Sequence, residues 1–358
     1  MKWTHMLSAA LLTLGLAAPA MAQNARSDQP GSVLVFHKFD ARNGVNATTP
    51  RSSFEISVTC PDGRQCPEFT DAVKLKALWS CPSSQRPRDK RICRATDFEL
   101  YTTVKGTLWF NPINATGEMS PTGSPPAPIR VPFVPTPACN DGYLVVWVIN
   151  PLDQPISFNG LIGNAIVRNG ANDASSYNAL AIQSPAPAGT ILSQDANAAL
   201  AFDGVVYNKV TSNVYGTVRY EDAATNLQTS LTLLTLDVRA NRPNLVTFVP
   251  FVFFNENERP ISTFHEFICW SEKRLTEINR NLNIGFGGLG AKKGLMESSA
   301  RATQQNTNFP FDTFDATLVG VLQTREGGNA RSYAYGLYND GVGVSTLLCH
   351  NASASCPR

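Results

Sequence analysis

The chain has 358 residues, of which 43% are hydrophobic and 16% charged, and its 30 basic and 28 acidic side chains give a formal charge of +2. This composition excludes an intrinsically disordered chain, which would lack the apolar residues needed for a core. It also disfavours a protein dedicated to DNA or RNA, because no strong positive field is available to attract a polyanion. We therefore expect a globular protein, and its 25 glycines and 24 prolines indicate many turns.

The N-terminus has the pattern of an export signal. Lys2 precedes an apolar stretch from Met6 to Ala18, and the A-x-A pattern at residues 20–22 is typical of signal-peptidase cleavage after Ala22. Residues 1–22 are therefore predicted to be a signal peptide, and the protein is predicted to be exported to the periplasm or the extracellular space. No transmembrane segment is expected, because the longest later apolar run, Leu245–Phe254, is too short to span a bilayer.

Twelve segments rich in β-branched and aromatic residues, most of them closed by turn-forming residues, are candidate strands. In chain order they are Ser32–Phe39, Ser52–Thr59, Val73–Trp79, Asp97–Phe110, Gly142–Asn150, Leu161–Val167, Ala199–Tyr207, Leu231–Val238, Leu245–Phe254, Phe264–Trp270, Ala316–Gln323 and Arg331–Tyr338. In the segment Ser32–Phe39, strict alternation would place His37 and Phe39 on the face of Val33, and Lys38 on the opposite face. Tyr143–Ile149 and Leu245–Phe254 are apolar on both faces, which is typical of central strands in stacked sheets.

Helical spacing is clear only at Leu275, Ile278 and Leu282, after a candidate N-cap at Ser271. The strands therefore predict a mainly β fold with two β-sandwich domains, immunoglobulin-like or jelly-roll-like, pinned by disulfides. The turn-rich stretch Ser184–Asn197 suggests domains at 23–190 and 191–358. Residues 112–137 are rich in proline, and we expect them to form a polyproline-type excursion of the first domain.

Eight cysteines in an exported chain predict disulfide bonds. Three pairs lie close together around turns or polar loops, and elimination leaves a fourth: Cys60 with Cys66, Cys81 with Cys93, Cys349 with Cys356, and Cys139 with Cys269. Because eight thiols allow 105 pairings, the fourth pair rests on elimination alone. No C-x-x-C spacing occurs, and only three histidines, His37, His265 and His350, follow the signal, so neither a metal site nor a cofactor is expected.

Several segments together resemble an uncharacterised family of secreted bacterial β-rich proteins, known as hypothetical proteins of unknown function. The resemblance spans residues 31–345 and rests on Gly31–Phe36, Gly142–Trp147, Phe158–Arg168, Ser176–Leu180, Leu236–Pro243, Phe267–Trp270 and Arg331–Tyr335. Members of the family have proline where this chain has His37. The resemblance implies export and a shared fold, and it implies no catalytic residue.

Candidate catalytic residues are few. Glu256 and Glu258 form the densest acidic loop, and His265 follows on a predicted strand. A glycosidase needs two opposed carboxylates and a nucleophilic hydrolase needs a base, so these three residues are the candidates for a secreted hydrolase of glycans or esters. A solvated turn and a structural histidine explain the same residues. Gly285–Gly290 matches G-x-G-x-x-G, but it lacks the surrounding strand and helix pattern of a nucleotide site, so a flexible loop is expected.

A basic cluster lies within or beside the predicted Cys81–Cys93 loop, and its residues are Arg86, Arg88, Lys90, Arg91 and Arg94. Held on one loop, these charges would suit an anionic envelope polysaccharide or another surface protein, although a solvated exposed hairpin is the favoured explanation. A second group, Trp79, Trp109, Trp147 and Trp270, lies in apolar strand contexts and is expected in the core rather than on a sugar-binding platform.

The sequence predicts many strands and offers few candidate catalytic residues. We therefore favour an exported, non-enzymatic structural or interaction protein of the bacterial envelope or extracellular space. The alternative is the secreted hydrolase that uses Glu256, Glu258 and His265. The sequence does not indicate the oligomeric state.

Overall fold

The computed structural model describes residues 25, 28–42, 51–61, 72–82, 93–113, 117–120, 129–131, 134–170, 173–236, 245–284, 292–304, 313–327, 331–336, 338–344 and 346–348. Strands make up 61% of these residues and helices 4%, so the mainly β prediction is confirmed. Every pair of neighbouring strands in the named sheets is antiparallel. The predicted signal peptide lies outside the described residues.

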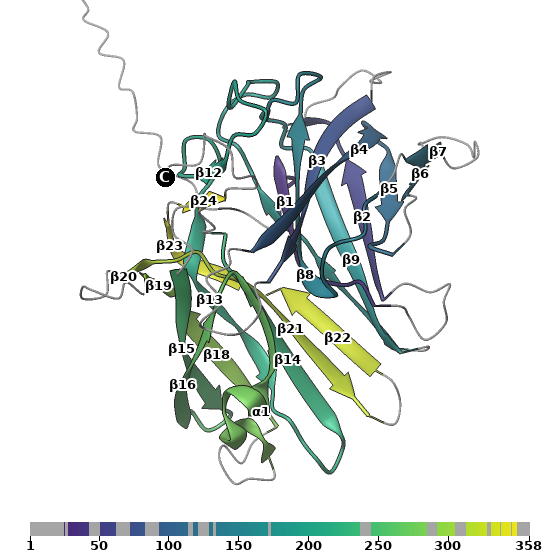
Figure 1. Cartoon of the computed structure of the whole chain (residues 1–358). Coiled ribbons are helices and arrows are strands. Elements are labelled where there is room, and N and C mark those ends of the chain that lie inside the picture. The colour runs from purple at the N-terminus through teal and green to yellow at the C-terminus, as the bar shows by residue number, and fades with distance from the viewer. Residues whose placement is uncertain are drawn as a thin grey trace, which may run out of the picture.

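The first part of the chain forms two stacked sheets, drawn in purple to teal in Figure 1. The five-stranded sheet contains, in spatial order, β11 (Leu180–Ile182), β1 (Val33–Asp40), β8 (Asp141–Ile149), β3 (Ala72–Cys81) and β4 (Arg94–Thr103). The six-stranded sheet contains β10 (Asp173–Asn178), β9 (Leu161–Gly170), β2 (Ser52–Val58), β5 (Thr107–Phe110), β6 (Gly117–Ser120) and β7 (Ile129–Val131). A core centred on the rings of Phe36, Phe39, Phe54, Trp79, Phe98 and Phe110 joins them.

The later part of the chain forms a second pair of sheets. The seven-stranded sheet contains β20 (Thr313–Asp315), β19 (Arg301–Gln304), β15 (Leu245–Asn255), β18 (Lys293–Ser299), β13 (Val210–Arg219) and β23 (Tyr338–Val344), with β16 (Pro260–Phe267) paired to β15. The four-stranded sheet contains β17 (Trp270–Arg274), β14 (Leu227–Leu234), β21 (Val319–Glu326) and β22 (Arg331–Gly336). A second core lies between them, built around Phe251, Phe253 and Met296. A short ribbon pairs β12 (Leu200–Phe202) with β24 (Thr346–Leu348).

The last strand of the first pair of sheets ends at Ile182, and the first strand of the second pair begins at Val210. The domain boundary at 190/191 lies between these residues and stays a prediction. A third core joins the two sandwiches. On one side it contains Val33, Val35, Tyr143, Val145 and Trp147 from the five-stranded sheet, and on the other Leu234, Trp270 and Val319 from the four-stranded sheet. The central strands of the five-stranded sheet, β1 and β8, therefore form a middle layer with both faces buried. This explains why these strands read as continuous apolar runs.

The prediction of central strands is right for both segments, Tyr143–Ile149 and Leu245–Phe254, because β8 pairs with β1 and β3 and β15 pairs with β16 and β18. Of the two, only β8 has both faces buried. In β15, Val249, Phe251 and Phe253 point into the second core, whereas the residues of the opposite face, Val246, Phe248, Pro250, Val252 and Phe254, are only half-buried. Their side of the seven-stranded sheet is an outer face of the molecule. Among the four tryptophans expected in the core, Trp79, Trp147 and Trp270 are buried and Trp109 is half-buried.

Three predicted elements have different bounds in the structure. Asp97–Phe110 is divided into β4 and β5 by a turn at Lys105, whose φ of 65° reverses the chain between the two sheets. Two proline-free pieces of the predicted excursion, β6 and β7, pair as strands of the six-stranded sheet. The helical turn α1 (Leu275–Ile278), followed by the 3-10 turn η2 (Arg280–Leu282), begins after Arg274, because Ser271 belongs to β17.

Two of the predicted disulfide pairings are wrong. The structure joins Cys81 to Cys139 and Cys93 to Cys269, with Cα–Cα distances of 5.7 and 6.5 Å. Cys81 lies opposite Arg94 in the β3–β4 ladder, so Cys93, one residue earlier, points to the other face of the sheet. Accordingly Cys81 lies in the first core and Cys93 in the third, and they cannot meet. The Cys93–Cys269 bond links the two sandwiches.

None of the described cysteines is free, and Cys60 is also disulfide-bonded. Cys66, Cys349 and Cys356 lie outside the described residues, so the pairs Cys60–Cys66 and Cys349–Cys356 stay predictions. Among the described residues, no helix has the length and apolar character that crossing a bilayer requires.

Proteolysis of the non-reduced protein followed by mass spectrometry should recover cross-linked peptides that contain Cys93 with Cys269 and Cys81 with Cys139. Replacing Cys93 and Cys269 by alanine should lower the free energy of unfolding by about 5 kcal/mol, against about 4 kcal/mol for Cys81 and Cys139, because the bonds close 176 and 58 residues respectively. A peptide joining Cys81 to Cys93 would contradict the structure.

Candidate functional site

A group of buried polar side chains lies where β1 meets the second sandwich. The pairing of β1 with β8 shifts register between Phe36 and Phe39, which marks a β-bulge at His37 and Lys38. Because of the inserted residue, Phe39 packs in the first core with Phe36, and the predicted alternation that placed it beside Val33 is wrong. The bulge frees two peptide groups from the ladder and turns Lys38 toward the second sandwich.

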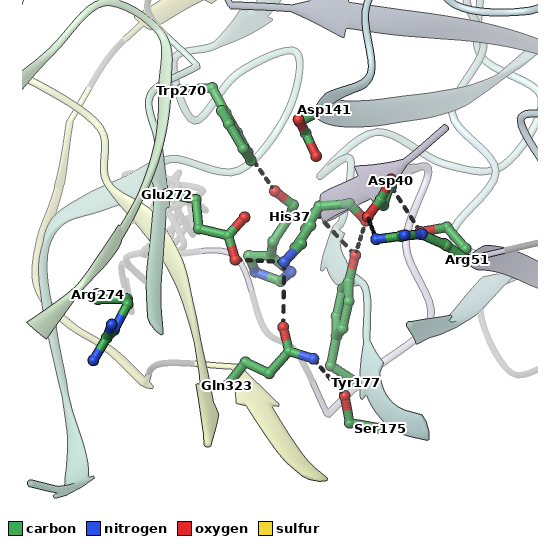
Figure 2. Close-up of polar contacts among 12 residues, drawn as sticks. His37, Asp40, Arg51, Asp141, Ser175, Tyr177, Trp270, Glu272, Arg274 and Gln323 are labelled. Atoms are coloured by element: carbon green, nitrogen blue, oxygen red, sulfur yellow. Dashed lines mark hydrogen bonds and ion pairs between the residues drawn. The ribbon is translucent and has the colours of Figure 1, made fainter. Parts of the chain in front are cut away.

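Side chains from two distant strands satisfy these peptide groups (Figure 2). The Lys38 N–H donates to the Tyr177 hydroxyl at 2.9 Å, and the same hydroxyl donates to the Lys38 carbonyl at 2.6 Å. The Trp270 indole N–H donates to the His37 carbonyl at 2.9 Å. Tyr177 belongs to the first sandwich and Trp270 to the second, so the bulge is held from both sides.

The Lys38 ammonium crosses the junction between the sandwiches. It forms an ion pair with Glu272 on β17 and donates to Gln323 Oε1 on β21 at 3.2 Å. Gln323 Nε2 in turn donates to Ser175 Oγ on β10 at 2.9 Å, which returns the chain of contacts to the first sandwich. The Lys38 side chain is only 7% exposed, so its charge depends on these partners. We call this set, His37, Lys38, Ser175, Tyr177, Trp270, Glu272 and Gln323, the junction cluster.

His37 is the one histidine of the junction cluster. It is 3% exposed, and its ring contacts the Tyr177 ring edge-on with 5.3 Å between centroids. Burial lowers the pKa of His37 to about 3, so the imidazole is neutral at physiological pH. Its Nδ1 has no hydrogen-bond partner in the described part of the chain. The residue therefore packs as a neutral ring.

A second group of charges borders the junction cluster at the end of β1. Asp40 accepts from Arg42 Nε at 2.8 Å and lies 3.5 Å from Arg51 Nη1, while Arg42 also reaches Asp141 at 3.2 Å. The hydrogen bond to Asp40 raises the pKa of Arg42, and burial raises the pKa of Asp141 above its ordinary value. These charges are paired with one another, and the arrangement fixes the chain where it leaves β1.

The structure does not bring the predicted catalytic residues together. Glu256 and Glu258 are exposed in the turn between β15 and β16, where the Asn255 side chain accepts the N–H groups of Asn257 and Arg259. His265 lies five residues beyond the start of β16, about 17 Å along an extended strand. The acidic pair thus belongs to a side-chain-capped hairpin turn.

His265 has a different partner, which the sequence did not indicate. Its Nε2 lies 2.8 Å from Ser271 Oγ on β17, so the pair connects the seven-stranded and four-stranded sheets. Burial, with a smaller effect from Lys273, lowers the pKa of His265 to about 4. No carboxylate is recorded as bonded to this ring within the described residues, so the pair differs from a hydrolase triad in which a third group orients the base.

The remaining predicted sites fall mostly outside the described residues. This applies to Arg86, Arg88, Lys90 and Arg91 and to the glycine loop 285–290, while Arg94 is exposed at the start of β4. Within the described ranges, no group of three or more His, Cys, Asp or Glu side chains is placed to hold a metal ion.

Sequence reasoning placed His37, Lys38 and Trp270 in strands but did not predict that they would form the junction cluster. The one available signal was Lys38, a charge in the middle of an apolar strand. Its partner Glu272 lies 234 residues later in the sequence, and no local pattern connects the two positions.

No known protein-family model matches the chain, and the search of curated proteins finds no match. The fold defines a disulfide-linked, mainly β protein built from several antiparallel sheets.

Removing the Lys38 ammonium should destabilise the fold strongly, because it leaves the Glu272 carboxylate partly buried without its cation. We expect Lys38→Ala to lower the free energy of unfolding by about 3 to 5 kcal/mol, and Lys38→Met with Glu272→Leu to recover most of the loss. The matched control is Arg219→Ala, which breaks the more exposed Arg219–Glu326 pair and should cost less than about 1 kcal/mol. Guanidinium denaturation measures all three, and equal losses for Lys38→Ala and Arg219→Ala would contradict the role of Lys38.

Acid should weaken the fold through His37 and His265. Both pKa values lie below the ordinary 6.5, so between pH 6.5 and about 4 the unfolded chain binds protons that the folded chain excludes. The free energy of unfolding is therefore highest above pH 6.5. As the pH is lowered below 6.5, each histidine reduces it by about 1.4 kcal/mol per pH unit. Denaturant unfolding between pH 7 and pH 4.5 should show a shallower pH dependence for His37→Gln and for His265→Gln. If the free energy of unfolding of both variants changed with pH as steeply as that of the parent protein, the two rings would be protonated in the folded state, which would contradict the prediction.

Proposed function

We propose that the protein is an exported, non-enzymatic interaction protein of the bacterial envelope or extracellular space. The observation that carries the proposal is the joining of the two sandwiches into one body by the third core and the Cys93–Cys269 bond. Disulfide bonds form and persist in oxidising compartments, which supports export. A body fixed in this way presents its outer sheet faces in one geometry, so a partner binds it with little loss of conformational entropy.

The placement of the titratable groups supports binding over catalysis. Three deeply buried ones, Lys38, Asp40 and His37, serve the packing of β1 against its neighbours. Lys38 and Asp40 are paired with opposite charges, and the histidine is kept neutral by burial. A catalytic group needs access to substrate and a pKa near the working pH. The hydrolase alternative finds no geometric support, because Glu256 and Glu258 lie apart from His265.

Expression of the full chain in a Gram-negative bacterium tests the proposal. We expect the protein in the periplasm or the medium, starting at Gln23, with oxidised cysteines. The purified protein should sediment with isolated envelope material and release no soluble sugar or ester product, and a Glu256→Gln, Glu258→Gln variant should sediment equally well. A cytoplasmic protein with free thiols, or hydrolysis that disappears in His265→Ala, would overturn the proposal.

A further inference from the structure

The outer face of the seven-stranded sheet is hollowed by a groove of about 770 Å³ over β13, β15 and β18. Its lining residues are Asn213, Val214, Tyr215, Pro250, Val252, Leu295, Glu297, Ser298 and Ser299. The ladder places Tyr215 and Val252 on either side of Glu297 in one row. Their sequence neighbours Val214, Phe251 and Met296 point into the second core, so this row faces away from it.

The lining of the groove combines two kinds of surface. Pro250, Val252 and Leu295 supply an aliphatic floor, and the Tyr215 ring stands at one side with 37% of its surface exposed. Glu297 is exposed in the same row and offers a carboxylate that accepts hydrogen bonds. A ligand that fits has both an apolar face and several hydroxyl donors, and a sugar ring has both. The volume falls in the range of about 300 to 1,000 Å³ that is typical of ligand sites.

The position of the groove within the sheet argues against an extended peptide. β18 is hydrogen-bonded to β15 on one side and to β13 on the other, and β13 is in turn paired with β23. Main-chain recognition of a peptide needs an open strand edge, and the centre of the groove has none. Recognition here has to use side chains.

A second aromatic platform lies on the same face. Phe264 on β16 lies opposite Pro250, is 56% exposed, and stacks on Phe248 with 5.1 Å between ring centroids. Three strand spacings, about 14 Å, separate its strand from that of Tyr215. Aromatic rings on both sides of the groove suit a chain of several sugar units better than a single sugar.

We propose that this groove binds a neutral polysaccharide, with Tyr215 and Phe264 stacking on sugar rings and Glu297 accepting hydroxyl hydrogen bonds. The inference rests on the proposed interaction function and names the ligand class and the surface that would carry it. The ligand differs from the anionic polysaccharide suggested by the basic cluster, because a different surface of the chain binds it.

The test measures binding of the mature, oxidised protein to cellulose, chitin, curdlan and starch granules. Alginate and phosphatidylglycerol vesicles serve as anionic-polymer and lipid probes. We expect retention on at least one neutral polysaccharide, with little change in about 0.5 M NaCl. Tyr215→Ala and Glu297→Ala should each raise the Kd about tenfold or more, and Phe264→Ala should raise it by less. Leu152→Ala, which truncates an exposed apolar side chain of the first sandwich, is the matched control and should bind like the parent.

Three results would overturn the inference: no retention on any neutral polysaccharide, equal retention of Tyr215→Ala and Glu297→Ala with the parent, or binding confined to alginate or the vesicles. Thermal unfolding of each variant checks that a binding loss is not a folding loss. If the parent sediments with envelope material and both groove variants sediment equally, the groove assignment fails while the interaction function stands. Release of soluble sugar from a bound polysaccharide would contradict the interaction function itself.

Discussion

Burial of both faces of β1 and β8, the central strands of the five-stranded sheet, is the constraint on which the rest of the molecule depends. Strands β1 and β8 send alternate side chains into the first core and into the third core that they share with the second sandwich. A sheet with two apolar faces is stable in water only when both are covered. The second sandwich therefore completes the first, and the Cys93–Cys269 bond starts from the same sheet face that the third core covers.

The bulge in β1 allows the apolar five-stranded sheet to contain a buried charge, the Lys38 ammonium. It leaves peptide groups that Tyr177 and Trp270 satisfy from opposite sides of the junction, and it places the Lys38 ammonium within reach of Glu272. Two apolar side chains in place of Lys38 and Glu272 would stabilise the junction equally well. An ion pair, however, is satisfied in fewer relative placements of the two sandwiches than an apolar contact is. We infer that the junction cluster sets how the sandwiches are placed, which in turn fixes the outer face that carries the groove.

The sequence predicted the parts of the fold that depend on composition and periodicity. The apolar run at Tyr143–Ile149 correctly indicated a central strand. The bulge at His37 escaped prediction because it depends on an inserted backbone residue rather than on residue type. Disulfide pairing failed because sheet register decides which face Cys93 occupies. Strands β13 and β18 were missed because serine, asparagine and glycine interrupt their apolar pattern. Tyr215 and Glu297 were therefore not considered as site residues.

Calorimetry tests the central claim most directly, because cores that share one sheet have to unfold together. For the oxidised full-length protein we predict a single heat-absorption peak, with a calorimetric enthalpy of unfolding equal to the van't Hoff enthalpy. Two separable peaks, one for each sandwich, would contradict the account, since the five-stranded sheet would then stay folded with one of its apolar faces exposed to water.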